Sequence, residues 1–268
     1  MQMPVAVLLG TTGLGQLPGL AAAPAAAARE GGRQSSGMLT IAAAASLADA
    51  FAQIGQAFER SHPGVTVRFN FAASGILLQQ LVRGAPVDVL ATADAQTMQR
   101  AIERGVVDQR TQVEFAANTL VLVEPRQRPV GTPALAALDD LRAPHVKRIA
   151  LGKPATVPVG NYTRQVLVAG GLWEVLQPKL IPADSTRQVL DYVGRGEVAA
   201  GFVYSTDAAL SAQVRVVLVF APPLHEAIRY PAAVVQESSR RELAGEFVRY
   251  LQLPDAQALL RRHGFAAP

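Results

Sequence analysis

Two serines stand where an apolar run of strand length gives way to a helical pattern. Ser46 follows residues 39–45, and Ser74 follows the alternating segment 65–71. Apolar residues after each serine recur at the spacing of one helix face, so a helix is expected to begin at each. The first turn of a helix offers N–H groups without intrahelical acceptors and the positive end of the helix dipole. Both serines are therefore candidate anion ligands.

The second half of the chain repeats this arrangement. Helices are expected to begin at 159–160 and at 185–186, and Tyr204 ends a buried strand with a phenolic hydroxyl that can donate. Ligands of open α/β sheets bind beyond the carboxyl ends of the strands, so these donors converge if the two halves face each other. A site made only of donors favours a fully deprotonated oxyanion, because a protonated one needs an acceptor for its hydrogen.

Simpler roles exist for the same residues. Ser46 can cap the helix that follows it, with Asp49 three positions later as the partner in a capping box. Tyr204 can be an ordinary core tyrosine. Lys153 and Arg187 are the cations near these turns, so an anion would be bound by dipoles and hydroxyls more than by counter-ions.

The order of elements predicts two α/β lobes. Strand–helix units follow one another in two groups, which predicts a mostly parallel sheet flanked by helices in each lobe. Two extended crossover segments join the groups. We expect residues 38–119 plus 232–268 to form lobe 1 and residues 120–231 to form lobe 2.

Composition limits the possible partners and compartment. The 268 residues are half hydrophobic, carry a net charge of +4 without any long basic run, and contain no cysteine. Nucleic acid is therefore not an expected partner, and disulfides and thiolate metal sites are excluded. Residues 1–30 are rich in Ala, Gly and Pro and end in Ala-x-Ala patterns, which predicts a signal peptide, although no basic residue precedes Arg29.

Six ordered motifs resemble the periplasmic molybdate-binding proteins of ABC importers. They are AAASL at 43–47, FAASG at 71–75, GAPVDV at 84–89, VPVGNY at 157–162, GFVYSTD at 201–207 and YPAAV at 230–234. The resemblance covers about residues 39–265, nearly the whole expected mature chain. It implies the two-lobed type II periplasmic-binding-protein fold.

The resemblance also implies a ligand and its contacts. Molybdate or tungstate would be held by the side chains of Ser46, Ser74 and Tyr204 and by the backbone N–H groups of Val159 and Thr186. No cofactor is implied. The implied partner is the permease of an ABC importer, and the protein is expected to be a periplasmic monomer. Residues 184–187 follow the family pattern only loosely, and Lys153 stands where the family often has Asn or Asp.

Three alternatives remain open at this stage. A sulfate or other oxyanion receptor would have the same architecture with a cavity of different size. A cytoplasmic sensing domain of similar fold would keep its N-terminal residues. Catalysis is not expected, because none of the four histidines falls in a metal-ligand spacing or near a nucleophile motif, and Ser46 has no evident base.

Overall fold

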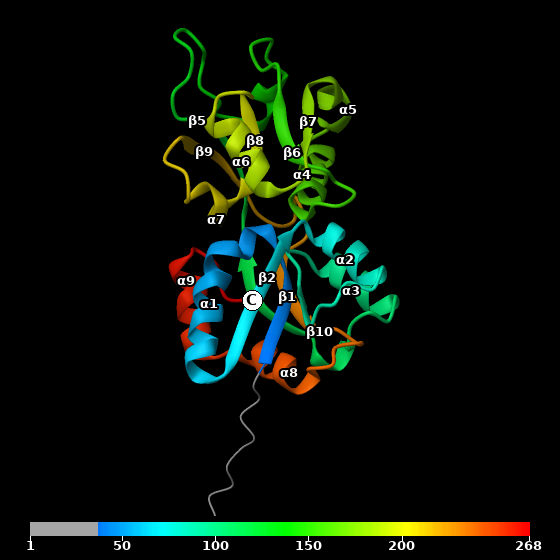
Figure 1. Cartoon of the computed structure of the whole chain (residues 1–268). Coiled ribbons are helices and arrows are strands. Elements are labelled where there is room, and N and C mark those ends of the chain that lie inside the picture. Colours follow the sequence, from blue (N-terminus) through cyan, green and yellow to red (C-terminus); the bar gives the residue numbers. More distant parts are fainter. Residues whose placement is uncertain (1–36) are drawn as a thin grey trace, which may run out of the picture. The chain divides into compact units, whose positions relative to one another are not determined.

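The computed structural model describes residues 37–268, and the predicted signal peptide lies outside the described residues. These residues form two lobes, each built around a five-stranded sheet with helices packed on it (Figure 1). In each sheet four strands run in one direction and a single strand runs the other way. The two-lobed α/β prediction is confirmed.

The first sheet has the strand order β2-β1-β3-β10-β4, with β10 antiparallel to both of its neighbours. Its strands are β1 (Gly37–Ala44), β2 (Val65–Ala72), β3 (Val89–Ala91), β4 (Val113–Asn118) and β10 (Ile228–Val234). The helices of this lobe are α1 (Ala48–Ser61), α2 (Ser74–Val82), α3 (Ala95–Glu103), α8 (Arg241–Tyr250) and α9 (Pro254–Arg262).

The second sheet has the order β7-β6-β8-β5-β9, and here β5 is the antiparallel strand. Its strands are β5 (Leu120–Pro125), β6 (Ile149–Gly152), β7 (Leu180–Ala183), β8 (Ala200–Tyr204) and β9 (Val214–Phe220). The helices of this lobe are α4 (Pro158–Ala169), α5 (Trp173–Leu176), α6 (Thr186–Gly194) and α7 (Ser205–Ala208).

Core packing fixes the strand ends that carry the site. The predicted apolar face of α1 is buried, and the Phe51 ring lies 5.6 Å from the ring of Phe115 while Phe58 lies 5.2 Å from Phe247. On the opposite side of the sheet, buried residues of α2 and α3 cover β1 and β3. The end of β1 that leads into the Ser46 turn is therefore packed on both sides.

The chain passes between the two sheets at two places. Strand β4 ends at Asn118 and β5 begins at Leu120, so these two strands of different sheets are separated by Thr119 alone. The expected lobe boundary at residue 232 falls inside β10. This strand is central in the first sheet although it contains Pro231, because its pairing with β4 shifts register between Tyr230 and Pro231.

Candidate functional site

Four of the five predicted ligand residues line one cavity between the lobes. Ser46 and Ser74 come from the first lobe, and Thr186 and Tyr204 from the second. Each is at most 5% exposed. The cavity is small: the space open to the centre of a water molecule is about 10 Å³, about enough for one water molecule, so this arrangement has no room for an organic solute.

Val159 does not line the cavity with its side chain, which is packed in the core. The residues just before it, Val157 and Pro158, do line the cavity. Val159 is the second residue of α4, where an N–H group has no intrahelical acceptor. The start of α4 lies close against β6, since a Cβ added to Gly160 would lie 1.9 Å from the carbonyl oxygen of Gly152. Glycine at this position is what allows the turn to form.

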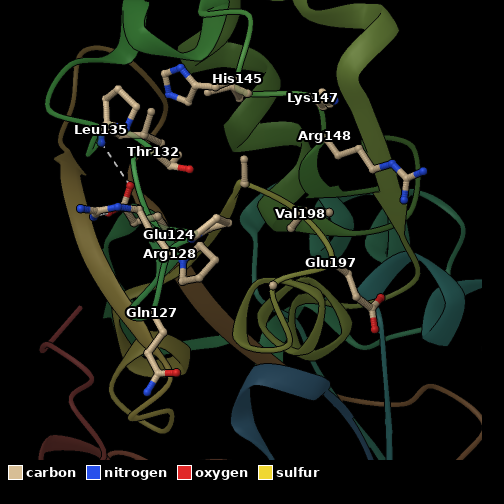
Figure 2. Close-up of a pocket in the computed structure, with 16 residues that line it drawn as sticks. Glu124, Gln127, Arg128, Thr132, Leu135, His145, Lys147, Arg148, Glu197 and Val198 are labelled. Carbon is tan, nitrogen blue, oxygen red and sulfur yellow. Dashed lines mark hydrogen bonds and ion pairs between the residues drawn. The ribbon is translucent and has the colours of Figure 1, made fainter.

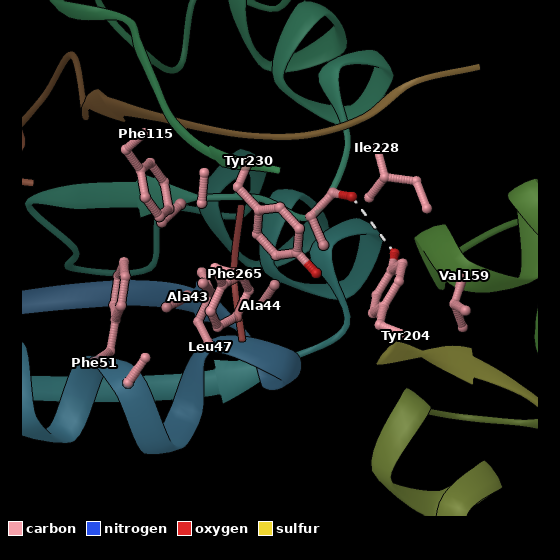
Figure 3. Packing of buried hydrophobic residues seen from close by; sticks show 14 of the residues in the cluster. Ala43, Ala44, Leu47, Phe51, Phe115, Val159, Tyr204, Ile228, Tyr230 and Phe265 are labelled. Carbon is pink, nitrogen blue, oxygen red and sulfur yellow. Dashed lines mark hydrogen bonds between the residues drawn. The ribbon is translucent and has the colours of Figure 1, made fainter. Parts of the chain in front are cut away.

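Ala93 ties two of the predicted ligands together. Its N–H donates to Ser74 Oγ at 3.0 Å. Its carbonyl oxygen accepts a long contact of 3.5 Å from the Tyr204 hydroxyl, the dashed line at Tyr204 in Figure 3. Ser74 therefore keeps its own hydrogen for a ligand. Burial raises the pKa of Tyr204 well above its ordinary value, so the phenol remains a donor. Sequence analysis missed Ala93, because its contribution comes from the backbone.

Ser46 is not the cap that the capping-box interpretation required. A short 3-10 turn (Ala45–Leu47) precedes α1, and Leu47 is the N-cap without any side-chain bond. Ser46 Oγ instead lies 3.1 Å from the hydroxyl of Tyr230, and the Asp49 carboxylate accepts a hydrogen bond from Arg187. The extra turn moves Ser46 away from the helix end, so its hydroxyl stays in the cavity wall.

Carboxylates neutralise both cations near the site. Arg187, the residue after Thr186, lies between two of them, with Nη2 2.6 Å from Asp49 Oδ2 and Nε 2.7 Å from Asp207 Oδ1. Lys153 pairs with Asp184. The polar groups that face the cavity are therefore uncharged hydroxyls and peptide groups.

Asp207 is fully buried, and burial raises its pKa to about 6 even with Arg187 beside it. Between pH 4 and 6 the folded state holds a proton that the unfolded state has lost, so rising pH lowers the stability of the folded state. We expect the wild type to lose about 2 kcal/mol relative to Asp207→Asn over this range. Urea unfolding of both proteins at several pH values measures this. A constant difference between them would contradict it.

The lobes also touch through their backbones next to the cavity. The N–H of Gly75, at the start of α2, donates to the carbonyl oxygen of Thr156 at 3.0 Å. A Cβ at Gly75 would lie 2.7 Å from that oxygen and 2.8 Å from Thr156 Cα. The structure is therefore a closed form that requires glycine at this contact.

A larger cavity of about 630 Å³ lies in the second lobe and contains none of the predicted ligands (Figure 2). Buried Glu124 lies in its wall and accepts hydrogen bonds from Arg128, from Arg215 Nε at 2.6 Å and from the Leu135 N–H at 3.1 Å. These bonds use the carboxylate to hold the segment 126–135 in place. The arrangement is structural.

Comparison with known proteins places this geometry in a family. Residues 39–266 match the family model described as bacterial extracellular solute-binding protein. The chain belongs to this family. This solute-binding protein is 35% identical over 232 residues to the molybdate-binding protein ModA of Escherichia coli K12, covering 85% of this chain and 89% of that one.

Two further relatives match this chain over most of their length, and one of them is a solved structure. A putative ABC transporter substrate-binding lipoprotein of Bacillus subtilis, YvgL, is 34% identical over 229 residues, which is 85% of this chain and 86% of the relative. The solved substrate-binding domain of a putative molybdenum ABC transporter from Clostridium difficile is 30% identical with a TM-score of 0.66. That match covers 86% of this solute-binding protein and 99% of the domain.

Residues 37–268 also bear on metal binding and on membrane insertion. No group of three or more His, Asp or Glu side chains within this range could hold a metal ion. None of the helices in the same range is both long and apolar enough to cross a bilayer.

Proposed function

We propose that this solute-binding protein captures molybdate, and also tungstate, between its two lobes and delivers it to the permease of an ABC importer. The observation that carries the proposal is the cavity between the lobes, which is lined by uncharged hydroxyl groups from both of them: Ser46 and Ser74 on one side, Thr186 and Tyr204 on the other. The names of the relatives in Escherichia coli and Clostridium difficile support molybdenum as the element carried.

Ligand capture follows from the placement of these donors on two lobes. Only the closed form puts both sets of donors around one ion, so the ion stabilises closure by the contacts that it gains there. Each hydrogen bond to a charged oxygen contributes about 1.5–3 kcal/mol. Five such bonds, less the free energy lost on association, give a dissociation constant between about micromolar and nanomolar.

This function requires the protein to act outside the cytoplasm. We propose export to the periplasm with cleavage of residues 1–30, and a working monomer without nucleic-acid partners. The N-terminal mass of the protein recovered from the periplasm tests the cleavage. An uncleaved protein found only in the cytoplasm would favour the sensing-domain alternative.

Calorimetry with molybdate, tungstate, sulfate and phosphate at pH 7.5 tests the ligand. We expect molybdate and tungstate to bind at micromolar concentrations or below, sulfate more weakly, and phosphate not at all, because the cavity offers hydrogen phosphate no carboxylate acceptor. Sulfate binding tighter than molybdate binding would favour the sulfate-receptor alternative. Phosphate binding without molybdate binding would overturn both oxyanion assignments.

Single serine variants test the two side-chain ligands of the first lobe. We expect Ser46→Ala and Ser74→Ala each to weaken molybdate binding by about 1–3 kcal/mol while thermal unfolding changes little. Ser61→Ala is a matched control, because Ser61 lies at the exposed end of α1 and bonds only locally. Unchanged dissociation constants in both site variants would refute these contacts.

A further inference from the structure

Three polar side chains form a chain of hydrogen bonds that leads from the crossover between the lobes to the cavity wall. Asn118 Nδ2 lies 3.1 Å from the Tyr230 hydroxyl, which lies 3.1 Å from Ser46 Oγ. Asn118 ends β4, Tyr230 lies in β10, and Ser46 follows β1. The three come from separate parts of the sequence and meet at one end of the first sheet.

The backbone fixes the direction of the first bond. Asn118 Oδ1 accepts from the Thr119 N–H at 2.8 Å and from the Ser205 hydroxyl at 3.0 Å. A flipped amide would place its NH₂ group against the Thr119 N–H, donor against donor. The NH₂ group of Asn118 must therefore face Tyr230, and it also donates to Thr206 Oγ1 at 2.9 Å.

The direction of the first hydrogen bond sets the direction of the second. Tyr230 accepts from Asn118, so its own hydrogen points to its other partner, Ser46. Tyr230 is fully buried, which raises its pKa above the ordinary value and keeps that hydrogen in place. Ser46 Oγ thus receives a hydrogen bond from the protein, and the hydrogen of Ser46 remains available to the cavity.

We propose that Asn118 and Tyr230 are positioning residues that hold Ser46 as a donor toward the cavity and so reject oxyanions that carry a proton. The inference rests on the proposed oxyanion function and assigns its selectivity to two residues outside the cavity lining. Ser74 is oriented in the same way, because its oxygen accepts a hydrogen bond from the Ala93 N–H and its own hydrogen is left for the cavity. A serine with a freely rotating hydroxyl can turn either its hydrogen or a lone pair toward the ligand, whereas the bond that each of these two serines accepts turns its hydrogen toward the cavity.

Comparing the binding of selenate with that of hydrogen arsenate distinguishes the positioning role of Asn118 and Tyr230 from a general contribution to the stability of the fold. At pH 8 both are tetrahedral dianions of similar size, but only the arsenate carries a hydrogen. Competition against bound molybdate gives both dissociation constants, and their ratio cancels effects of charge and of lobe closure. We expect the wild type to prefer selenate by at least about a hundredfold.

Tyr230→Phe removes the donor to Ser46 while keeping the ring that packs in the core. We expect this variant to bind molybdate about tenfold more weakly and to lose about tenfold of the preference for selenate over arsenate, because the Ser46 hydroxyl can now rotate and turn a lone pair toward the ligand. Tyr250→Phe is the matched control, since Tyr250 is a buried tyrosine of the same core cluster that does not line the cavity.

Asn118→Asp reverses the chain of bonds. A carboxylate has only acceptors, so Tyr230 would turn its hydrogen toward residue 118 and offer a lone pair to Ser46. The Ser46 hydrogen would then point away from the cavity, and the preference for selenate should fall further than in Tyr230→Phe. Circular dichroism melting checks that both variants are folded.

The outcomes separate the two levels of the proposal. A wild type that fails to bind molybdate overturns the proposed function. A wild type that binds molybdate but shows no preference for selenate overturns the inference alone. So does a preference that stays unchanged in folded Tyr230→Phe and Asn118→Asp.

Discussion

Replacing Gly75 with alanine is expected to weaken molybdate binding by about a thousandfold while each lobe stays folded. The new methyl group would lie within 2.8 Å of backbone atoms of Thr156, which cannot move aside as a flexible side chain could. The lobes would stop short of the closed form, and the donors of the second lobe would not reach the ion. Losing two bonds of about 2 kcal/mol each corresponds to this factor.

Calorimetry measures the loss of affinity, and small-angle scattering with and without molybdate measures closure. Gly245→Ala is the matched control, because Gly245 lies inside α8 where a Cβ meets only the end of the Arg249 side chain. That variant should bind normally and be slightly more stable, since alanine favours helix. Wild-type affinity in Gly75→Ala would mean that the contact with Thr156 is not needed for binding.

Replacing Arg187 with alanine is expected to destabilise the protein in a pH-dependent way. Burial raises the pKa of Asp207, and Arg187 opposes that rise and holds it at about 6. Without the guanidinium the carboxyl stays protonated to higher pH, so the added loss begins near pH 6. It grows by up to about 1.4 kcal/mol per pH unit and reaches about 3 kcal/mol at pH 8.

Chemical unfolding of the variant and the wild type at pH 5 and pH 8 measures this loss. The double variant Arg187→Ala with Asp207→Asn is the control, because it removes the buried carboxyl and should show no such pH dependence. An equal loss at both pH values would mean that Arg187 acts through packing or through its bond to Asp49 alone.

The sequence was most informative where a residue's role depends on its near neighbours. Ser74 was predicted from the strand before it and the helix after it, and the structure places it at the first position of α2. The Ser185–Thr186 helix start was recognised in the same way, and Ser185 accepts from the Gln188 N–H as a cap. Both features follow from about ten residues of chain.

What sequence analysis missed depends on distant contacts. The Ser46 and Tyr230 hydroxyls meet across 184 positions, and Arg187 meets Asp49 across 138. A cap within three residues was the only partner for Ser46 that local pattern could suggest. Strand β4 was missed because it has six residues and is followed almost at once by a strand of the other sheet. Whether such a short segment forms a strand depends more on the neighbouring strands it pairs with than on its own residues.

The tie between Ser74 and Tyr204 through Ala93 bears on how this protein would respond to mutagenesis. Both bonds use main-chain atoms, so replacing the methyl group with another small side chain leaves them in place. A screen that truncates side chains one at a time would score this position as silent, although two cavity residues depend on it. Its contribution would be exposed only by a change that alters the peptide unit itself, such as proline or an ester linkage.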